Sequence, residues 1–322
     1  MNPVEIVLLV IGIIALSGLV FSVFFTFYIA QRVYDKTLIR PDGEERVRKC
    51  SAPDNEEQLL MFNKGLEWAA AYASNAVPVD ITSDGLKLFG EYYDFGSDRA
   101  VIIIPGRTES LAYSYYYAEP YRKAGFNVFV FDSRGTGLSD GKYFSMGHLE
   151  HRDVLRFAEV LHDRFNNKDI FLHGICIGSS TAIYTLTSEN CPDYISAMCA
   201  DGMYKNFFET YRQHMKEWNR PAFPVAYEVM MILWKNTGAN CLTYGPYKAV
   251  RKLAKPILFI YTDKDQYSLP VESKKLFASC TSEMKEIRWF HKGTHSHVRI
   301  NNEEGYDEAI VDFTSKIYGE KA

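Results

Sequence analysis

The sequence predicts an α/β domain built on a mostly parallel, doubly wound sheet, with one transmembrane helix ahead of it. Short, wholly apolar runs recur along the chain and helical patterns alternate with them, which predicts the sheet. An uncharged apolar stretch near the amino terminus predicts the membrane helix. With 322 residues, the chain is long enough to bury a sizeable core.

The membrane helix is expected at residues 6–31, which carry no charge and are mostly Ile, Leu, Val and Phe. At about 1.5 Å per residue this stretch covers the ~30 Å hydrocarbon core of a lipid bilayer. A cleaved signal peptide would have a basic start and a shorter apolar run. Arg32, Lys36 and Arg40 follow the stretch and only Glu5 precedes it. The positive-inside rule therefore favours a cytoplasmic domain, with an outward-facing domain as the alternative. Residues 1–31 are thus predicted to be a membrane anchor.

A polar and charged segment, residues 32–76, follows the anchor. Within it, residues 56–74 have apolar side chains at helical spacing, so we expect a juxtamembrane linker and a helix.

Eight segments have the composition of strands. The first two, 77–81 and 86–93, flank Ser83-Asp84-Gly85, which predicts a hairpin. The other six are apolar runs at 101–104, 126–131, 170–172, 195–200, 257–261 and 286–290. Helical patterns alternate with these runs at 113–124, 147–164, 179–187, 271–278 and 305–317.

Residues 204–247 interrupt this alternation. They are rich in Phe, Trp, Met and Pro, and we expect a helical lid that covers the active site. The core of the domain is therefore predicted at residues 77–203 and 248–322.

A candidate nucleophile lies in Gly174-Ile175-Cys176-Ile177-Gly178, directly after the apolar run at 170–172 and before a helical segment. This context is typical of the tight strand-to-helix turn that presents a nucleophile, here with cysteine at the reactive position. The glycines leave room for neighbouring backbone on such a strained turn. A buried structural cysteine is the competing interpretation.

The other five cysteines are scattered, without a CxxC pair, at Cys50, Cys191, Cys199, Cys241 and Cys280. This spacing predicts neither a disulfide framework nor a zinc site, and we expect free thiols in a reducing compartment.

An acid and a base are expected in two later loops. Asp265 follows the run at 257–261 and can orient an imidazole; Asp263 is its neighbour and competitor, and Asp201 is a weaker candidate. His295 is the favoured base because the order nucleophile, acid, histidine suits such a turn. His297 in the same loop is the alternative.

The third histidine of that loop, His291, is expected to face solvent. No carboxylate or cysteine cluster lies beside the three histidines, so a metal site is not expected, and no cofactor is predicted.

Backbone N–H groups are expected to form an oxyanion hole. One is that of Ile177, directly after the nucleophile, and the other is that of Arg107, in Pro105-Gly106-Arg107-Thr108. The net charge of -4 and the lack of a long basic run argue against nucleic-acid binding.

These motifs make residues 79–319 resemble the α/β-hydrolase superfamily, especially its bacterial serine-aminopeptidase-like branch, whose members often have an amino-terminal membrane anchor. The resemblance is carried by Ser83-Asp84-Gly85-Leu86-Lys87-Leu88, Asp132-Ser133-Arg134-Gly135-Thr136-Gly137-Leu138-Ser139-Asp140-Gly141, His173-Gly174-Ile175-Cys176-Ile177-Gly178, Thr262-Asp263-Lys264-Asp265 and Gly293-Thr294-His295-Ser296. It implies the α/β-hydrolase fold and selects Asp265 and His295.

The sequence departs from the family pattern at two places. Pro105-Gly106 stands where the family has His-Gly, and Cys176 stands where it has serine. Relatives with cysteine include dienelactone hydrolases and the bile acid-CoA:amino acid N-acyltransferases. A thiolate paired with an imidazolium is a competent nucleophile and forms a thioester.

The expected activity is therefore hydrolysis of a small apolar ester or thioester by a Cys176–His295–Asp265 triad, in a protein held in the lipid bilayer through residues 6–31. An acyltransferase with the same acyl-cysteine intermediate and a non-catalytic binding protein on a hydrolase scaffold are the alternatives. The sequence predicts no particular oligomeric state.

Overall fold

The computed structural model describes residues 2–40, 48–107 and 109–319, and its centre is an eight-stranded sheet. The strand order is β1-β2-β4-β3-β5-β6-β7-β8. The strands are β1 (Ala76–Ser83), β2 (Leu86–Tyr93), β3 (Arg99–Ile104), β4 (Asn127–Phe131), β5 (Asp169–Ile175), β6 (Ile195–Asp201), β7 (Ile257–Thr262) and β8 (Lys285–Phe290). Every segment expected as a strand is a strand, so the predicted sheet is confirmed.

The sheet is mostly parallel. Only the first two pairs, β1 with β2 and β2 with β4, are antiparallel. In the β1–β2 hairpin, Ser83 pairs with Leu86, and the two turn residues Asp84 and Gly85 have φ of 48° and 79°. Such left-handed values at both positions are what a two-residue hairpin needs to match the twist of its strands.

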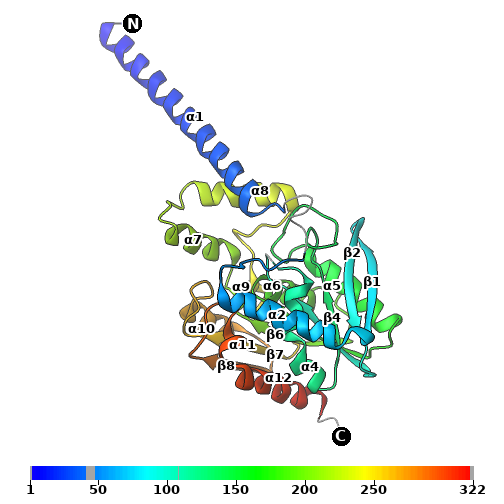
Figure 1. The fold of residues 1–322 in the computed structure, drawn as a ribbon. Coiled ribbons are helices and arrows are strands. Elements are labelled where there is room, and N and C mark those ends of the chain that lie inside the picture. The colour runs from blue at the N-terminus through cyan, green and yellow to red at the C-terminus, as the bar shows by residue number, and fades with distance from the viewer. Residues whose placement is uncertain (1, 41–47, 108, 320–322) are drawn as a thin grey trace.

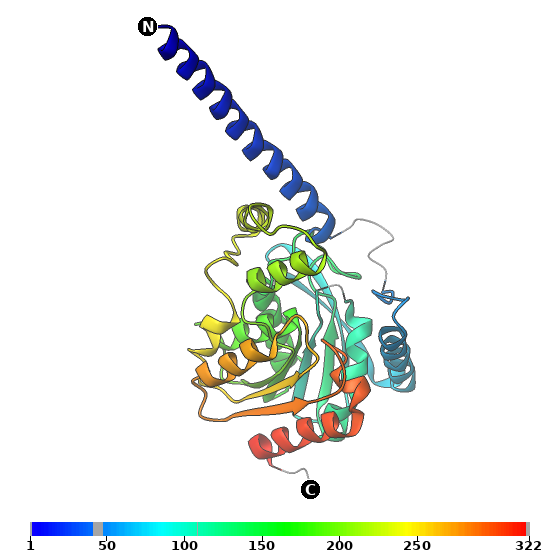
Figure 2. The same cartoon turned by 90° about the vertical axis from the view of Figure 1, so that its left-hand side faces the viewer.

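Helices cover both faces of the sheet (Figures 1 and 2). One apolar cluster joins the sheet to α5 (Glu150–Asp163), α6 (Ile177–Leu186), α9 (Pro246–Val250) and α10 (Pro270–Ser279). A second cluster joins the other face to α2 (Glu56–Ala71), α3 (Leu111–Ser114), η3 (Tyr115–Tyr117), α4 (Glu119–Lys123), α11 (Val298–Asn301) and α12 (Glu303–Tyr318). This arrangement is the predicted doubly wound architecture.

Two helical segments differ from expectation. The single helix expected at 113–124 is wrong: the chain forms α3, η3 and α4 instead. Pro120 lies in the first turn of α4, where its missing N–H costs nothing, whereas a continuous helix would need that donor. The helix expected at 56–74 ends at Ala71 and is followed by the short η2 (Ala73–Asn75).

The amino-terminal helix α1 (Pro3–Thr37) projects from the body of the molecule (Figures 1 and 2). It is long and apolar enough to cross a membrane by length and composition. The residues before Thr26 are exposed, whereas Ala30 and Tyr34 are buried. These two pack in a third apolar cluster with the insertion between β6 and β7, which holds α7 (Phe207–Glu217) and α8 (Val225–Thr237). The helix therefore continues past residue 31 and ends inside the folded domain.

Candidate active site

Cys176 lies at the turn between β5 and α6, with φ 53° and ψ −113°. A non-glycine residue with such angles is strained, and strain of this kind concentrates at functional sites. Positions 174 and 178 must be glycine because the surrounding backbone leaves no room for a Cβ atom. A Cβ at Gly178 would overlap the carbonyl oxygen of Ile104, and one at Gly174 would overlap the backbone of Gly178. The turn therefore holds the thiol at the carboxyl edge of the sheet.

His295 and Asp265 form a hydrogen-bonded pair beside this turn. His295 Nδ1 lies 2.8 Å from Asp265 Oδ2, and the other carboxylate oxygen accepts the N–H groups of Tyr267 and Ser268 at 2.8 and 2.7 Å. Within the described residues, the buried Nε2 of His295 has no hydrogen-bond partner, and His295 and Cys176 line the same pocket.

The imidazolium of His295 and the carboxylate of Asp265 each stabilise the charged form of the other. Burial lowers the pKa of His295, but Asp265 and Cys176 outweigh it and hold that pKa well above its ordinary value. Burial raises the pKa of Asp265, but His295 and the two N–H groups bring that pKa below its usual value. The site therefore favours an imidazolium next to a carboxylate.

The competing acids and bases have other partners. Asp263 is on the surface, where it accepts hydrogen bonds from Trp289 and His291. His297 Nε2 contacts Gln58 Oε1 at 2.9 Å. Asp201 is fully buried, accepts the hydroxyl of Tyr306 at 2.7 Å, and has its pKa raised by burial to about 6.

The expected oxyanion donors flank the thiol. Ile177 opens α6, so its N–H is among the first four of the helix, which have no acceptor within it. In the described part of the chain, neither Ile177 nor Arg107 donates its backbone N–H to a protein acceptor. A Cβ built on Gly106, next to Arg107, would lie 3.9 Å from Cys176 Cβ. Thr108, the last residue of the expected loop, lies outside the described residues.

The side chain of Arg107 makes a contact that the sequence did not predict. Its Nη1 donates to the carbonyl oxygen of Thr37, the last residue of α1, at 2.5 Å. Burial lowers the pKa of Arg107, and Cys176 is near enough to oppose that shift. A cation thus lies between the candidate nucleophile and the end of α1.

A pocket of about 360 Å³ surrounds the thiol and has two chemically distinct sides. The insertion and the turn supply mainly apolar and aromatic groups, Ile175, Ile177, Tyr204 and Phe207, and the loop after β7 adds Tyr267. The opposite wall is polar. There Glu109 accepts hydrogen bonds from Ser51 at 2.5 Å and from Gln58 at 2.9 Å.

Sequence reasoning missed this polar wall. Ser51 and Gln58 come from the segment interpreted as a juxtamembrane linker and a helix, and no motif marks them. His214 of α7 was also missed. It stacks on Tyr267 with ring centroids 4.1 Å apart, and burial lowers its pKa to about 4.

The Asp132–Gly141 motif has a structural role. Asp132 is fully buried and accepts the backbone N–H groups of Leu111 and Leu138 and the guanidinium of Arg48. Gly137 has φ 50°, and a Cβ there would overlap the Asp132 carboxylate. The motif thus fixes the loop after β4 and the start of α3 behind the pocket.

All six cysteines are free. Among the residues that the structure describes, no group of three or more His, Cys, Asp and Glu is arranged to hold a metal ion.

Comparison with known proteins gives one family match and several relatives. The family model for serine aminopeptidase, S33, matches residues 96–226, less than half of the chain. The chain is 26% identical to the uncharacterized protein YqkD of Bacillus subtilis over 66% of this chain and 70% of that protein. It is 25% identical to the uncharacterized membrane protein YNL320W of Saccharomyces cerevisiae over 72% and 77%. The similarity is thus not confined to bacteria.

Solved structures show the fold. The Pyrococcus furiosus esterase Pf2001 superposes with a TM-score of 0.64 at 23% identity, covering 77% of this chain and 93% of that one. The α/β hydrolase GrgF from Penicillium gives 0.59 at 18% identity, covering 75% and 98%. The chain therefore has the α/β-hydrolase fold, as the sequence predicted.

Proposed function

We propose that this protein is a membrane-anchored acyl hydrolase that forms a covalent thioester on Cys176. The observation that carries the proposal is the pairing of a strained cysteine turn with a buried His295 whose Nδ1 is held by Asp265. Hydrolysis as the reaction class is supported by the serine aminopeptidase match and by the esterase among the structural neighbours.

The proposed reaction has two halves. His295 takes the proton of the Cys176 thiol, and the thiolate attacks the carbonyl carbon of the substrate. The N–H groups of Ile177 and Arg107 stabilise the oxyanion. When the bond to the leaving group breaks, His295 gives its proton to the departing alcohol or thiol. Water, deprotonated by His295, then attacks the thioester, and the acid leaves as the thiol is restored.

The pocket supports a substrate with an apolar acyl part and a polar remainder. The apolar side can enclose a short or medium acyl chain. The polar wall offers carboxylate, amide and hydroxyl groups for hydrogen bonds with the leaving group. This proposal keeps the expected apolar acyl substrate and adds a polar leaving group.

Anchoring by α1 is part of the proposal. Its support is a helix whose residues 6–31 carry no charge and whose residues before Thr26 are exposed, together with a relative named as a membrane protein. The cations Arg32 and Lys36 follow the apolar stretch, and so we place the domain on the cytoplasmic side.

Full-length protein in detergent tests the proposed reaction. It is expected to hydrolyse medium-chain p-nitrophenyl esters, and intact-mass measurement is expected to detect an acyl adduct. Cys176→Ala should abolish both signals, whereas Cys191→Ala, a half-buried cysteine next to Lys255, should leave them unchanged. Full activity in Cys176→Ala would exclude Cys176 as the nucleophile.

Alkylation separates an enzyme from an inert scaffold. Iodoacetamide should label Cys176 much faster than the other cysteines, because a thiolate paired with an imidazolium is the reactive form. Uniformly slow labelling would favour a binding protein instead.

A further inference from the structure

The insertion exposes an unusual set of large apolar side chains on α8. Tyr227, Met231 and Trp234 follow one another at helical spacing, and Trp234 is 52% and Met231 48% exposed. Phe223, just before the helix, is 77% exposed and contacts the ring of Tyr227. The opposite face of α8 is buried. A helix with one buried face and one exposed aromatic face is expected to have a partner for the exposed face.

The packing of α8 against α1 sets its height relative to a bilayer. Thr26 Oγ1 of α1 donates to Glu228 Oε1 of α8 at 2.7 Å, and burial of α1 begins at Thr26. The apolar residues from Ile6 to this point amount to about 30 Å of helix, which is the thickness of the hydrocarbon core. A helix that crosses the bilayer with this stretch therefore holds α8 at the membrane surface, at the base of α1 (Figures 1 and 2).

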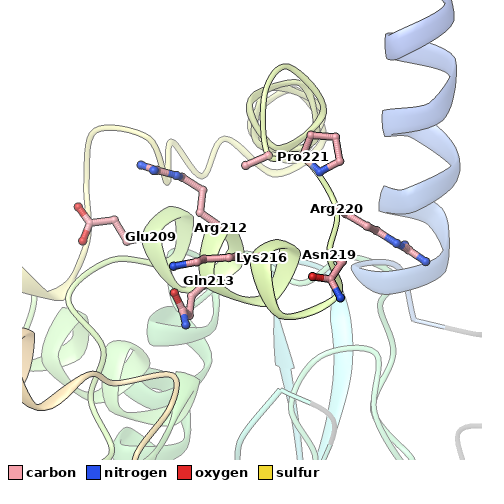
Figure 3. Close-up of a pocket in the computed structure, with 8 residues that line it drawn as sticks. Glu209, Arg212, Gln213, Lys216, Asn219, Arg220 and Pro221 are labelled. Carbon is pink, nitrogen blue, oxygen red and sulfur yellow. The ribbon is translucent and has the colours of Figure 1, made fainter.

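Cations surround the same surface. Arg212 and Lys216 of α7 and Arg220 after it line an open pocket beside α8, and Arg220 points toward α1 (Figure 3). All three are exposed, and none forms an ion pair with a carboxylate of the described residues. Lys235 lies next to Trp234 on α8 and is exposed as well. Aromatic side chains flanked by basic side chains are typical of protein surfaces that lie at the membrane–water interface.

We propose that the exposed face of α8, together with Arg212, Lys216 and Arg220, is a docking surface for the headgroup layer of an anionic bilayer, the bilayer that α1 crosses. The aromatic side chains enter the interface between headgroups and acyl chains, and the cations bind lipid phosphates. This inference rests on the anchoring proposed above but not on catalysis.

The docking surface has a consequence for the site. The side of α7 opposite its cations supplies Phe207, Thr210 and His214 to the catalytic pocket. Docking would therefore hold the helix that forms part of the pocket wall at the bilayer surface.

Quenching by brominated lipid tests this arrangement in the full-length protein. The chain has four tryptophans, and Trp218 and Trp234 are exposed on the insertion, whereas Trp68 and Trp289 lie elsewhere. In vesicles of phosphatidylcholine and phosphatidylglycerol, lipids dibrominated near the top of the acyl chain should quench part of the emission. Trp218→Phe/Trp234→Phe should lose that quenchable part, and its remaining emission should not respond to bromine.

Charge variants test the two components separately. Met231→Glu keeps every tryptophan and should reduce quenching by placing a charge on the apolar face. Val271→Glu is the matched control, because Val271 is 57% exposed on α10 and is not part of the docking surface, and it should leave quenching unchanged. Arg212→Gln/Lys216→Gln should reduce quenching in anionic vesicles more than in phosphatidylcholine alone.

Flotation with the vesicles separates the possible failures. Protein that does not float lacks the proposed anchor, and the docking surface fails with it. Protein that floats but whose quenching matches that of Trp218→Phe/Trp234→Phe would overturn the docking surface alone and would leave both the anchor and the acyl hydrolase standing.

Discussion

Gly178→Ala tests whether the turn around Cys176 controls the geometry of the reaction. The added methyl group would overlap the carbonyl oxygen of Ile104 and lie 2.9 Å from the carbonyl oxygen of Pro105, below the 3.0 Å that real Cβ atoms keep. Both obstacles are backbone, so α6 and the loop that ends β3 must move apart. Such overpacking costs about 1–3 kcal/mol of stability.

The same displacement separates the two proposed oxyanion donors, because Ile177 lies on α6 and Arg107 lies in that loop. A misplacement of roughly 1 Å costs about 100-fold in rate. We therefore expect kcat/KM for a p-nitrophenyl ester to fall by about that factor while the urea midpoint shifts down.

Gly305→Ala is the matched control for this substitution. Gly305 is exposed in the first turn of α12, and a Cβ there meets only Phe290 at 3.6 Å. This change should leave kcat/KM unchanged and stabilise the protein by up to about 1 kcal/mol, because alanine is the better helix former. If Gly178→Ala matched Gly305→Ala in both measurements, the turn would not control the geometry of the reaction.

Three further outcomes are expected. Because the carboxylate of Asp265 raises the pKa of His295, the imidazolium is present below that raised pKa and is lost as pH rises through it. Asp265→Asn should therefore move the alkaline limb of the pH–rate profile to lower pH and reduce kcat by about 10²–10⁴-fold. An unmoved limb would contradict the pairing of His295 with Asp265. Asp263→Asn, on the surface, should change kcat/KM by less than about twofold. Deletion of residues 2–25 should preserve ester hydrolysis in detergent, whereas deletion of residues 2–40 should abolish it and lower the urea midpoint; equal activity of the two would show that the end of α1 is dispensable.

The fold and the turn at Cys176 could be predicted from local sequence. A strand that is covered on both faces needs a continuous apolar run, and so the segments that became β3 to β7 could be recognised without a structure. The turn at Cys176 could be recognised in the same way. Its two glycines are needed because a Cβ at either position would overlap the backbone of the turn itself or of the adjoining strand.

The choice between His295 and His297 could not be made from local chemistry. The two residues share one loop and differ only in direction: His295 meets Asp265, whereas His297 meets Gln58, a residue 239 positions away in the sequence. The polar wall was missed for the same reason. Glu109 and Gln58 become neighbours only when α2 packs against α3, and no periodicity in either segment predicts that contact.

The carboxyl-terminal end of α1 is part of the folded domain. Ala30, Tyr34 and Leu38 are each no more than 1% exposed and pack in one cluster with Ile177, next to the nucleophile. Burial of a large apolar side chain contributes on the order of 1.5–3 kcal/mol. Pulling this end of α1 out of the domain would therefore cost stability, so it does not behave as a flexible tether.

Thr37, at the end of α1, accepts a hydrogen bond from the guanidinium of Arg107, which fixes one side of the loop that holds a proposed oxyanion donor. Since the same helix contacts α8 at Thr26, a single helix connects the insertion with the loop that contains Arg107. In the proposed membrane-anchored arrangement, this packing would set the distance from the bilayer to Cys176.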